Sequence, residues 1–262
     1  MTVFKHEWRQ GWKSWLIWTL AIGSLVVLVN LIWPDMAGTA DGWSAMFQNL
    51  GAFGDAFGLD QLNLGELLHF YGLEISNILG IGGALYAAIS GINSLASEEG
   101  KHTAEFLLSH PIRRSSVIGQ KLAAVLSQVT ALHLTVVVMS YLSILAISET
   151  VDMELFLLFH FSLWLMTIQI TLICFGISAF LTQENVGLGI GVALLLYFLN
   201  LFVNMSDRLT LLQYATPFAY ADPADVLIHE ALNLKIAVPQ LIVSAVLTGI
   251  GWRVYSKRDL RA

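Results

Sequence analysis

Two histidines could do chemistry, because each of them falls inside a long apolar run. His133 lies in the run 122–147 and His160 in the run 155–181. An ionisable side chain at the depth of a bilayer is by default a candidate for function, and this pair would suit a membrane enzyme that acts on lipid. The structural alternative is a neutral histidine that hydrogen-bonds a neighbouring helix. Both interpretations stay open from the sequence alone.

Motifs for other kinds of chemistry are missing from the sequence. It has no G-x-x-x-x-G-K-[ST] loop for the phosphates of ATP, no H-E-x-x-H, no cysteine cluster and no serine-hydrolase elbow. The apolar runs also carry too few ionisable groups for the relay of a proton-driven transporter. We therefore expect no enzymatic activity of the chain itself and no metal or cofactor bound by it. Polar residues that could line a path through a membrane are Glu74, Asn77, Gln128, His133 and His160.

The long polar stretch between two apolar runs covers residues 97–121. It holds three acidic residues, four Lys or Arg residues and Pro111. A short helix is expected before the proline, and on it Phe106, Leu107 and Leu108 would form one apolar face between acidic and basic flanks. Such a face suits insertion into a groove of a partner protein. The alternative is an ordinary polar loop whose apolar face rests on lipid headgroups.

Apolar runs of membrane-spanning length must position these residues. The chain of 262 residues is 56% hydrophobic and 12% charged, whereas a soluble domain averages about 25% charged residues. The runs approach or exceed the roughly 18 residues that indicate a membrane span. They lie at 15–33, 73–95, 122–147, 155–181, 186–204 and 236–255. We therefore predict an all-α, polytopic integral membrane protein, in which residues 1–262 form a single domain with six transmembrane helices.

An amphipathic helix is predicted ahead of the first span, over residues 2–14. Aromatic residues recur there every three to four positions, and Lys5, Arg9 and Lys13 follow one another at i, i+4 and i+8. A helix with an aromatic stripe beside a basic one suits the membrane interface. A cleaved signal peptide fits less well, because there is no small-residue cleavage site after the apolar run. The first span is expected to end before Pro34.

The basic residues predict the orientation of the chain. The N-terminal helix, the segment 97–121 and the C-terminal end together hold eleven of the thirteen Lys and Arg residues. The positive-inside rule places these parts, and both termini, in the cytoplasm. The segments 34–72 and 205–235 are then extracytoplasmic, and the first of them carries five acidic residues but no Lys or Arg. The turn 182–185 carries no orientation signal, so the spans on either side of it stay uncertain in number and extent.

The segment 97–121 resembles the cytoplasmic segment of permeases from ATP-binding-cassette (ABC) transporters of the type-2 exporter class. Those permeases show an acidic pair, a Gly-x-x-x-x-Glu-hydrophobic-Leu-Leu stretch, a Ser-x-Pro, a basic residue and a Lys that enters the next span. The matching residues are Glu98, Glu99, Gly100, Glu105, Phe106, Leu107, Leu108, Ser109, Pro111, Arg113 and Lys121. Residues 215–227 similarly resemble the Pro-aromatic-Asp stretch before the last span of these permeases. Lys101 and His102 depart slightly, because the family more often has a Thr-containing pair there.

The resemblance implies a mechanism and a set of partners. The chain would pair in the cell membrane with a second permease, identical or related, and with two cytoplasmic ATPase subunits that bind ATP and Mg²⁺. Closure of the ATPases would push on the helix around 102–110 and reorient the spans. No nucleic-acid partner is implied. The coupling residues implied are Glu98, Glu99, Gly100, His102, Glu105, Phe106, Leu107, Leu108, Pro111 and Arg113.

Two other functions and the identity of the cargo stay open. A non-transporting scaffold or sensor would share the docking helix but would need no path between the spans, and a lipid-acting enzyme would use His133 and His160. Apolar span walls favour a lipid, a hydrophobic peptide or an amphipathic drug as the cargo. The acidic segment 34–72 fits cationic molecules, or simply follows the positive-inside rule.

Overall fold

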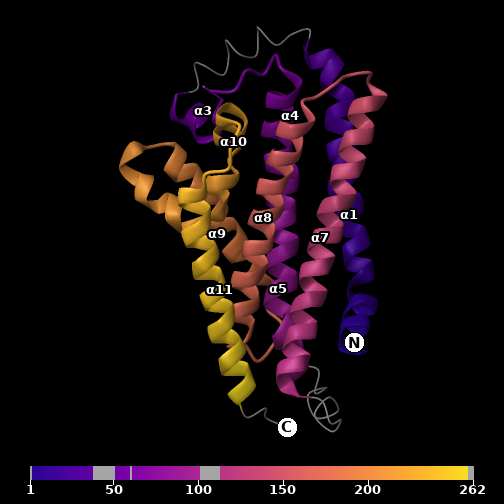
Figure 1. Ribbon diagram of the computed structural model, residues 1–262, viewed down its shortest axis with the longest axis vertical. Coiled ribbons are helices and arrows are strands. Elements are labelled where there is room, and N and C mark those ends of the chain that lie inside the picture. Colours follow the sequence, from indigo (N-terminus) through magenta and orange to yellow (C-terminus); the bar gives the residue numbers. More distant parts are fainter. Residues whose placement is uncertain (1, 38–50, 60, 101–112, 259–262) are drawn as a thin grey trace.

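Six helices of membrane-spanning length form one elongated bundle in the computed structural model of the chain (Figure 1). The structure describes residues 2–37, 51–59, 61–100 and 113–258, and the side chains of 52, 53, 97–100 and 207 lie outside that description. Helix is the only regular secondary structure within these ranges. The prediction of an all-α, polytopic membrane protein is therefore confirmed.

The six spans alternate in direction along the chain. They are α1 (Thr2–Ala37), α4 (Leu67–Ile75) continued by the π-helical turn η1 (Ser76–Ile81) and α5 (Gly82–Gly100), α7 (Arg114–Ala146), α8 (Met153–Ser178), α9 (Val186–Asn204) and α11 (Leu234–Lys257). Helix α1 begins and α11 ends at the lower end of the bundle in Figure 1, which we call the terminal end; the opposite end is the distal end. Because α8 and α9 are each long enough to cross a membrane, they are two spans rather than one re-entrant hairpin.

The first helix is longer than the sequence indicated. A separate interfacial helix over 2–14 and a span closed by Pro34 were expected, but α1 runs without a break from Thr2 to Ala37 and includes the proline. At 1.5 Å per residue it is about 54 Å long, against a hydrocarbon core of roughly 30 Å. The helix is thus longer than the hydrocarbon core is thick, and its first turns pack along α7. Gly11 permits this close packing, because a Cβ there would lie 2.5 Å from Nε2 of Gln128.

The second span begins earlier than predicted and contains an irregular turn. It starts at Leu67 rather than at residue 73, and η1 interrupts its α-helical hydrogen bonding after Ile75. Its glycines serve close packing, as small residues do between helices in lipid. A Cβ on Gly91 would lie 2.8 Å from the backbone oxygen of Thr171 on α8. Gly91 therefore lets α5 and α8 approach closely at this crossing.

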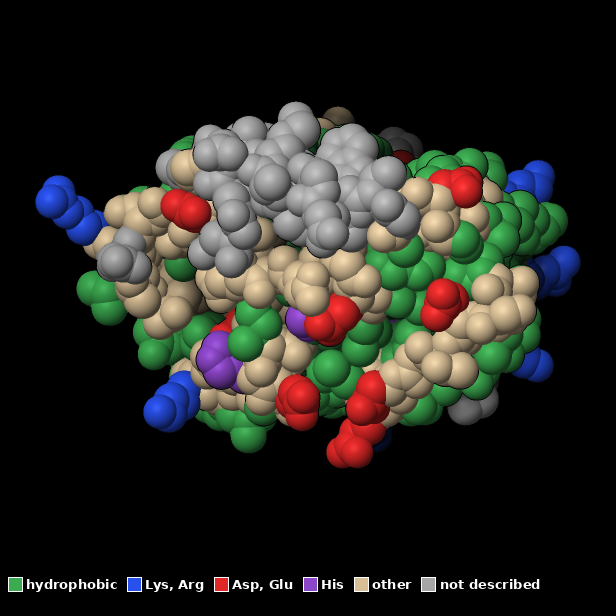
Figure 2. All heavy atoms as spheres, turned by 90° about the horizontal axis from the view of Figure 1, so that it is seen from above, with side chains coloured by type: hydrophobic (Ala, Val, Ile, Leu, Met, Phe, Trp, Pro, Cys, Tyr) green, Lys and Arg blue, Asp and Glu red, His purple; other side chains and the backbone are tan. Residues whose placement is uncertain are grey.

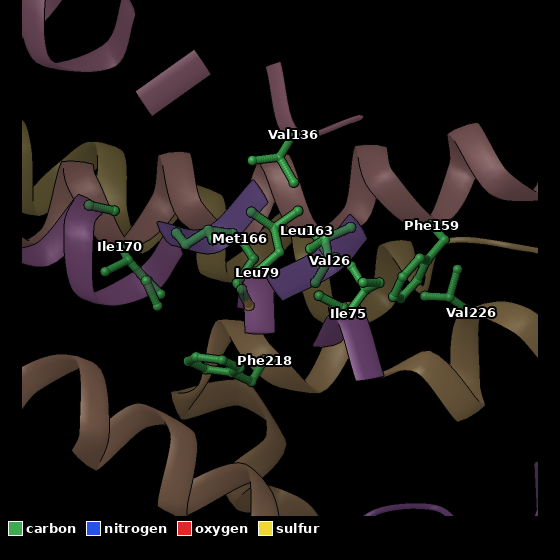
Figure 3. Close-up of a cluster of buried hydrophobic side chains, with 14 of the residues drawn as sticks. Val26, Ile75, Leu79, Val136, Phe159, Leu163, Met166, Ile170, Phe218 and Val226 are labelled. Atoms are coloured by element: carbon green, nitrogen blue, oxygen red, sulfur yellow. The ribbon is translucent and has the colours of Figure 1, made fainter. Parts of the chain in front are cut away.

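Apolar side chains from most of the helices meet in one large core cluster, part of which is shown in Figure 3. Helices α4, η1 and α8 contribute side chains that are buried almost completely, including Ile75, Leu79 and Leu163. Helices α9 and α11 instead expose many large apolar side chains along their length. An exposed apolar helix face suits contact with lipid, as expected of a bundle that spans a bilayer.

Short helices cover the distal end of the bundle. They are α3 (Ala52–Ala56), the 3₁₀ helices η2 (Asp207–Ala215) and η3 (Pro217–Ala221), and α10 (Pro223–His229). Hydrogen bonds attach this cover to the spans: Oγ1 of Thr216 donates to the oxygen of Leu196 at 2.6 Å, and Oη of Tyr220 donates to Oε1 of Gln169 at 2.8 Å. Most of the side chains of η3 are buried, so this part of the segment 205–235 is packed into the bundle.

Candidate functional site

The helices on either side of the predicted docking segment meet at the terminal end. Helix α5 runs to Gly100, and α7 begins at Arg114 with the exposed Arg113 as its N-cap. The backbone of Glu98, Glu99 and Gly100 therefore belongs to the last turn of α5, whereas the side chains lie outside the description. The other predicted coupling residues lie outside the described residues altogether: His102, Glu105, Phe106, Leu107, Leu108 and Pro111.

A buried ion pair joins these two helices to α1. Nζ of Lys121 on α7 lies 2.7 Å from Oε1 of Glu7 on α1, and it also donates to the backbone oxygen of Ser94 on α5 at 3.1 Å. The Lys121 side chain is 1% exposed and that of Glu7 is 18% exposed. An ammonium so far removed from water is stable only when it is paired and hydrogen-bonded. Lys121 therefore holds α1, α5 and α7 in one arrangement at the base of the docking segment.

Further polar contacts join the first turns of α1 to α7. Nε1 of Trp8 donates to Oγ of Ser127 at 2.8 Å, and Nε2 of Gln128 donates to the backbone oxygen of Glu7 at 3.3 Å. Gln128 was a candidate for lining a transport path, and the structure places it in the contact between two helices. The aromatic and amide side chains of this region thus fix the packing of α1 on α7.

Arginine contacts bring the ends of three helices together nearby. Nη1 of Arg114, at the start of α7, donates to the backbone oxygen of Arg258 at 2.7 Å, just after α11. Nη1 of Arg258 in turn donates to the oxygens of Ala179 and Leu181, at 3.2 and 3.0 Å. The carbonyl groups at a helix C-terminus favour a cation, and α8 ends here. A displacement of the start of α7 would therefore reach α8 and α11 as well.

The two intramembrane histidines lie against each other within a buried polar cluster. The rings of His133 on α7 and His160 on α8 pack edge to face with centroids 5.6 Å apart, and each residue is 3% exposed. Nε2 of His160 lies 2.6 Å from Oη of Tyr71, which also hydrogen-bonds Oγ of Ser140. Among the described residues, neither ring nitrogen of His133 has a hydrogen-bond partner, and His160 has one only at Nε2. The cluster thus combines one ring that is hydrogen-bonded at a single nitrogen with one that has no hydrogen-bond partner among the described residues.

The remaining path candidates flank the π-helical turn of the second span. Nδ2 of Asn77 donates to the oxygen of Leu73 at 3.0 Å, and Oδ1 of Asn77 accepts from Oη of Tyr197 on α9 at 3.1 Å. Glu74 precedes the turn and is partly buried. Turns of π-helix are frequent at functional sites. The structure therefore brings together His133 and His160 from the predicted set, whereas Asn77 contacts α9 and Gln128 contacts α1.

Several partners of these residues were missed from the sequence. Glu7, Tyr71 and Ser140 were not among the predicted site residues. The sequence offered one signal for the ion pair. Glu7 is a lone acid among three bases ahead of the first span, and Lys121 stands at the start of a later span. Nothing in the spacing predicted that Tyr71 would hydrogen-bond both His160 and Ser140.

A bundle of six membrane-spanning helices defines the chain as a polytopic membrane protein. A family model described as ABC-2 family transporter protein matches residues 1–260. The chain therefore belongs to the ABC-2 transporter family, and it is the permease component of an ABC transporter, which associates with ABC ATPase partners. The resemblance drawn from residues 97–121 is confirmed by this match. A search of curated proteins found no match to the chain.

Proposed function

We propose that the chain is the permease subunit of an ATP-driven exporter of the cell membrane and that its ATPases dock at residues 97–113. Two ATPase subunits and a second permease, identical or related, complete the transporter. Family membership supports a permease that takes its energy from separate subunits. The observation that carries the docking assignment is the junction at Lys121, because it connects both helices that flank the segment to α1.

The distribution of charge supports a cytoplasmic terminal end. The described bases of the first turns of α1, the start of α7 and the end of α11 all lie there, whereas Arg208 and Lys235 lie toward the distal end. Bases flanking membrane spans are retained on the cytoplasmic side. Under this orientation an ATPase in the cytoplasm reaches the segment between α5 and α7 directly.

Coupling is tested by co-purifying the full-length chain with its ATPase and measuring ATP hydrolysis. We expect Phe106→Ala to lower ATPase association or permease-stimulated hydrolysis by about tenfold or more, as truncation of a central aromatic contact does. Phe180→Ala is the matched control, because Phe180 is 57% exposed and follows α8 at the terminal end. Full association and stimulation with Phe106→Ala would show that the ATPase docks elsewhere.

The orientation can be tested with an impermeant thiol reagent, because the chain's single cysteine, Cys174, is buried. Leu211 is 83% exposed at the distal end, and Lys257 is exposed at the end of α11. We expect labelling of Leu211→Cys in intact cells and of Lys257→Cys only after permeabilisation. The opposite pattern would reverse the proposed orientation.

A further inference from the structure

A cavity with a strongly polar lining opens at the distal end, away from the junction at Lys121. Its volume is about 470 Å³, and it lies between α3, the end of α9, α10 and the start of α11. Polar lining side chains include those of Asp55, Asn204, Gln213, Asp222, Asp225 and Asn233. None of the lining residues in the described part of the chain is Lys or Arg. Figure 2 looks onto this end and shows acidic and histidine side chains over its middle and Lys or Arg side chains at its rim.

Asp222 is held in place by neutral donors. Its Oδ2 accepts from Nδ2 of Asn204 at 2.8 Å and from Nδ2 of Asn200 at 3.2 Å, and its Oδ1 accepts from the backbone N–H of Ala224 at 3.0 Å. Both amides lie on one face of α9, four residues apart. Burial raises the pKa of Asp222 above the usual range for a carboxyl group, because removal from water disfavours its charged form. A cation beside Asp222 would offset this cost.

Asn200 stands behind Asp222, and it is not one of the residues that line the cavity. Its side chain is only 6% exposed, and its carboxamide is directed at Asp222 through Nδ2. Its Oδ1 is buried and accepts no hydrogen bond from any described residue. A buried acceptor without a donor is costly, since it has lost water and gained nothing in return. The described partners of Asp222 thus give its carboxylate hydrogen bonds but no positive charge.

The cavity lining, which has three aspartates and no Lys or Arg among the described residues, selects one class of ligand. The described residues contain no group of three or more His, Cys, Asp or Glu side chains placed to hold a metal ion. An organic ammonium instead brings several N–H donors with its charge, and the cavity volume falls in the usual range for small-molecule sites, about 300–1,000 Å³. We propose that the cavity binds a small organic cation that carries amine or guanidinium groups, with Asp222 as its principal partner. Only the further step, that this cation is the cargo, rests on the proposed function.

The test uses the full-length chain in nanodiscs of uncharged phosphatidylcholine, with spermidine as the probe and calorimetry as the readout. Asp222→Asn removes the charge but keeps the N-cap of α10, because asparagine caps helices as well as aspartate does. We expect this variant to bind spermidine about tenfold to a hundredfold more weakly than the wild type, the range for losing a charged hydrogen bond. Asp225→Asn is expected to weaken binding in the same direction.

The matched control is Asp152→Asn. Asp152 caps α8 through its Oδ1, as Asp222 caps α10, but it does not line the cavity. Spermidine binding should therefore be unchanged in this variant. The proposal is wrong if the wild type does not bind spermidine, if Asp222→Asn folds and binds as tightly as the wild type, or if Asp152→Asn loses as much affinity as Asp222→Asn. No ATPase is present in this experiment, so its outcome is independent of the coupling test on Phe106.

Discussion

Nζ of Lys121 lies 2.7 Å from Oε1 of Glu7, across 114 positions of the sequence, and the lysine also reaches the backbone of α5 through Ser94. The contact joins the N-terminal turns of the chain to both helices that flank the proposed docking segment. A displacement of either helix at this end must therefore move α1 or break a buried ion pair. If the ATPases dock as proposed, the pair is a positioning element for coupling.

Breaking the pair from its two sides should have unequal effects on stability. Glu7→Leu removes the counter-charge that α1 supplies to the buried Lys121 ammonium, and losing one partner of a buried ion pair costs about 3–5 kcal/mol. Lys121→Met leaves a carboxylate that is 18% exposed and can regain some water, so the loss should be smaller. Thermal unfolding can be followed by the labelling of Cys174, which is buried in the folded chain.

The double variant Glu7→Leu with Lys121→Met provides the control for this comparison. It should be more stable than Glu7→Leu alone, because replacing both members of a buried pair by apolar groups is often neutral. Strictly additive losses in this cycle would contradict an interaction between the two side chains.

Glycine contacts between α8 and α11 should tolerate no added methyl group. A Cβ on Gly251 would lie 2.5 Å from the backbone oxygen of Gly176. Since a backbone atom cannot rotate away, Gly251→Ala should lower stability by about 1–3 kcal/mol, as overpacking does. Gly249→Ala, two residues earlier on α11, adds its Cβ where no atom lies within 4 Å. Melting curves should separate the two variants, and equal melting temperatures would show that the two helices are not packed this closely.

The histidine cluster predicts opposite effects for two substitutions. Tyr71→Phe removes the hydroxyl that bonds both His160 and Ser140, which should cost about 1–3 kcal/mol because buried partners are left unsatisfied. His133→Leu removes two buried nitrogens that have no partner among the described residues, so stability should be unchanged or higher. Thermal unfolding tests both changes. A large loss of stability in His133→Leu would show that this ring makes hydrogen bonds essential to the fold.

The same variant separates structure from function for His133. If His133→Leu is as stable as the wild type and still supports permease-stimulated ATP hydrolysis, the ring serves packing only. A stable variant without stimulated hydrolysis would instead assign His133 a part in transport, in line with the expectation for ionisable residues inside membranes.

Ionisation of Asp222 should lower stability as the pH rises. Burial raises the pKa of this carboxyl, so the folded chain favours the protonated form more than the unfolded chain does. Stability is then lost as the pH rises from the pKa of an aspartate in the unfolded chain, about 3.9, through the higher pKa of Asp222 in the folded chain. Asp222→Asn cannot ionise, so its melting temperature relative to wild type should increase with pH. Asp152→Asn is the control, because it makes the same change at an N-cap that does not line the cavity. If the difference in melting temperature between Asp222→Asn and the wild type does not vary with pH, the raised pKa is contradicted.

The number of spans and their approximate positions followed from local composition. A run of apolar residues cannot stay in water and satisfies its backbone within a helix, so hydropathy alone located α9 at 186–204. Boundaries were less predictable where packing overrides local signals. Helix α1 passes through the expected interfacial break, where its first turns pack on α7 at Gly11, and it also continues through Pro34.

The partners of the polar residues were decided by the tertiary structure. The sequence indicated that Lys121, His133 and His160 were unusual, and it indicated that residues 97–121 form a docking segment. It did not pair Lys121 with Glu7, or Asp222 with Asn204, because such pairs depend on how each helix is rotated about its axis and on which neighbour it packs against. Composition determines that a helix enters the bilayer, since transfer from water is a property of each residue. Close packing between helices distant in sequence determines which polar groups meet inside it.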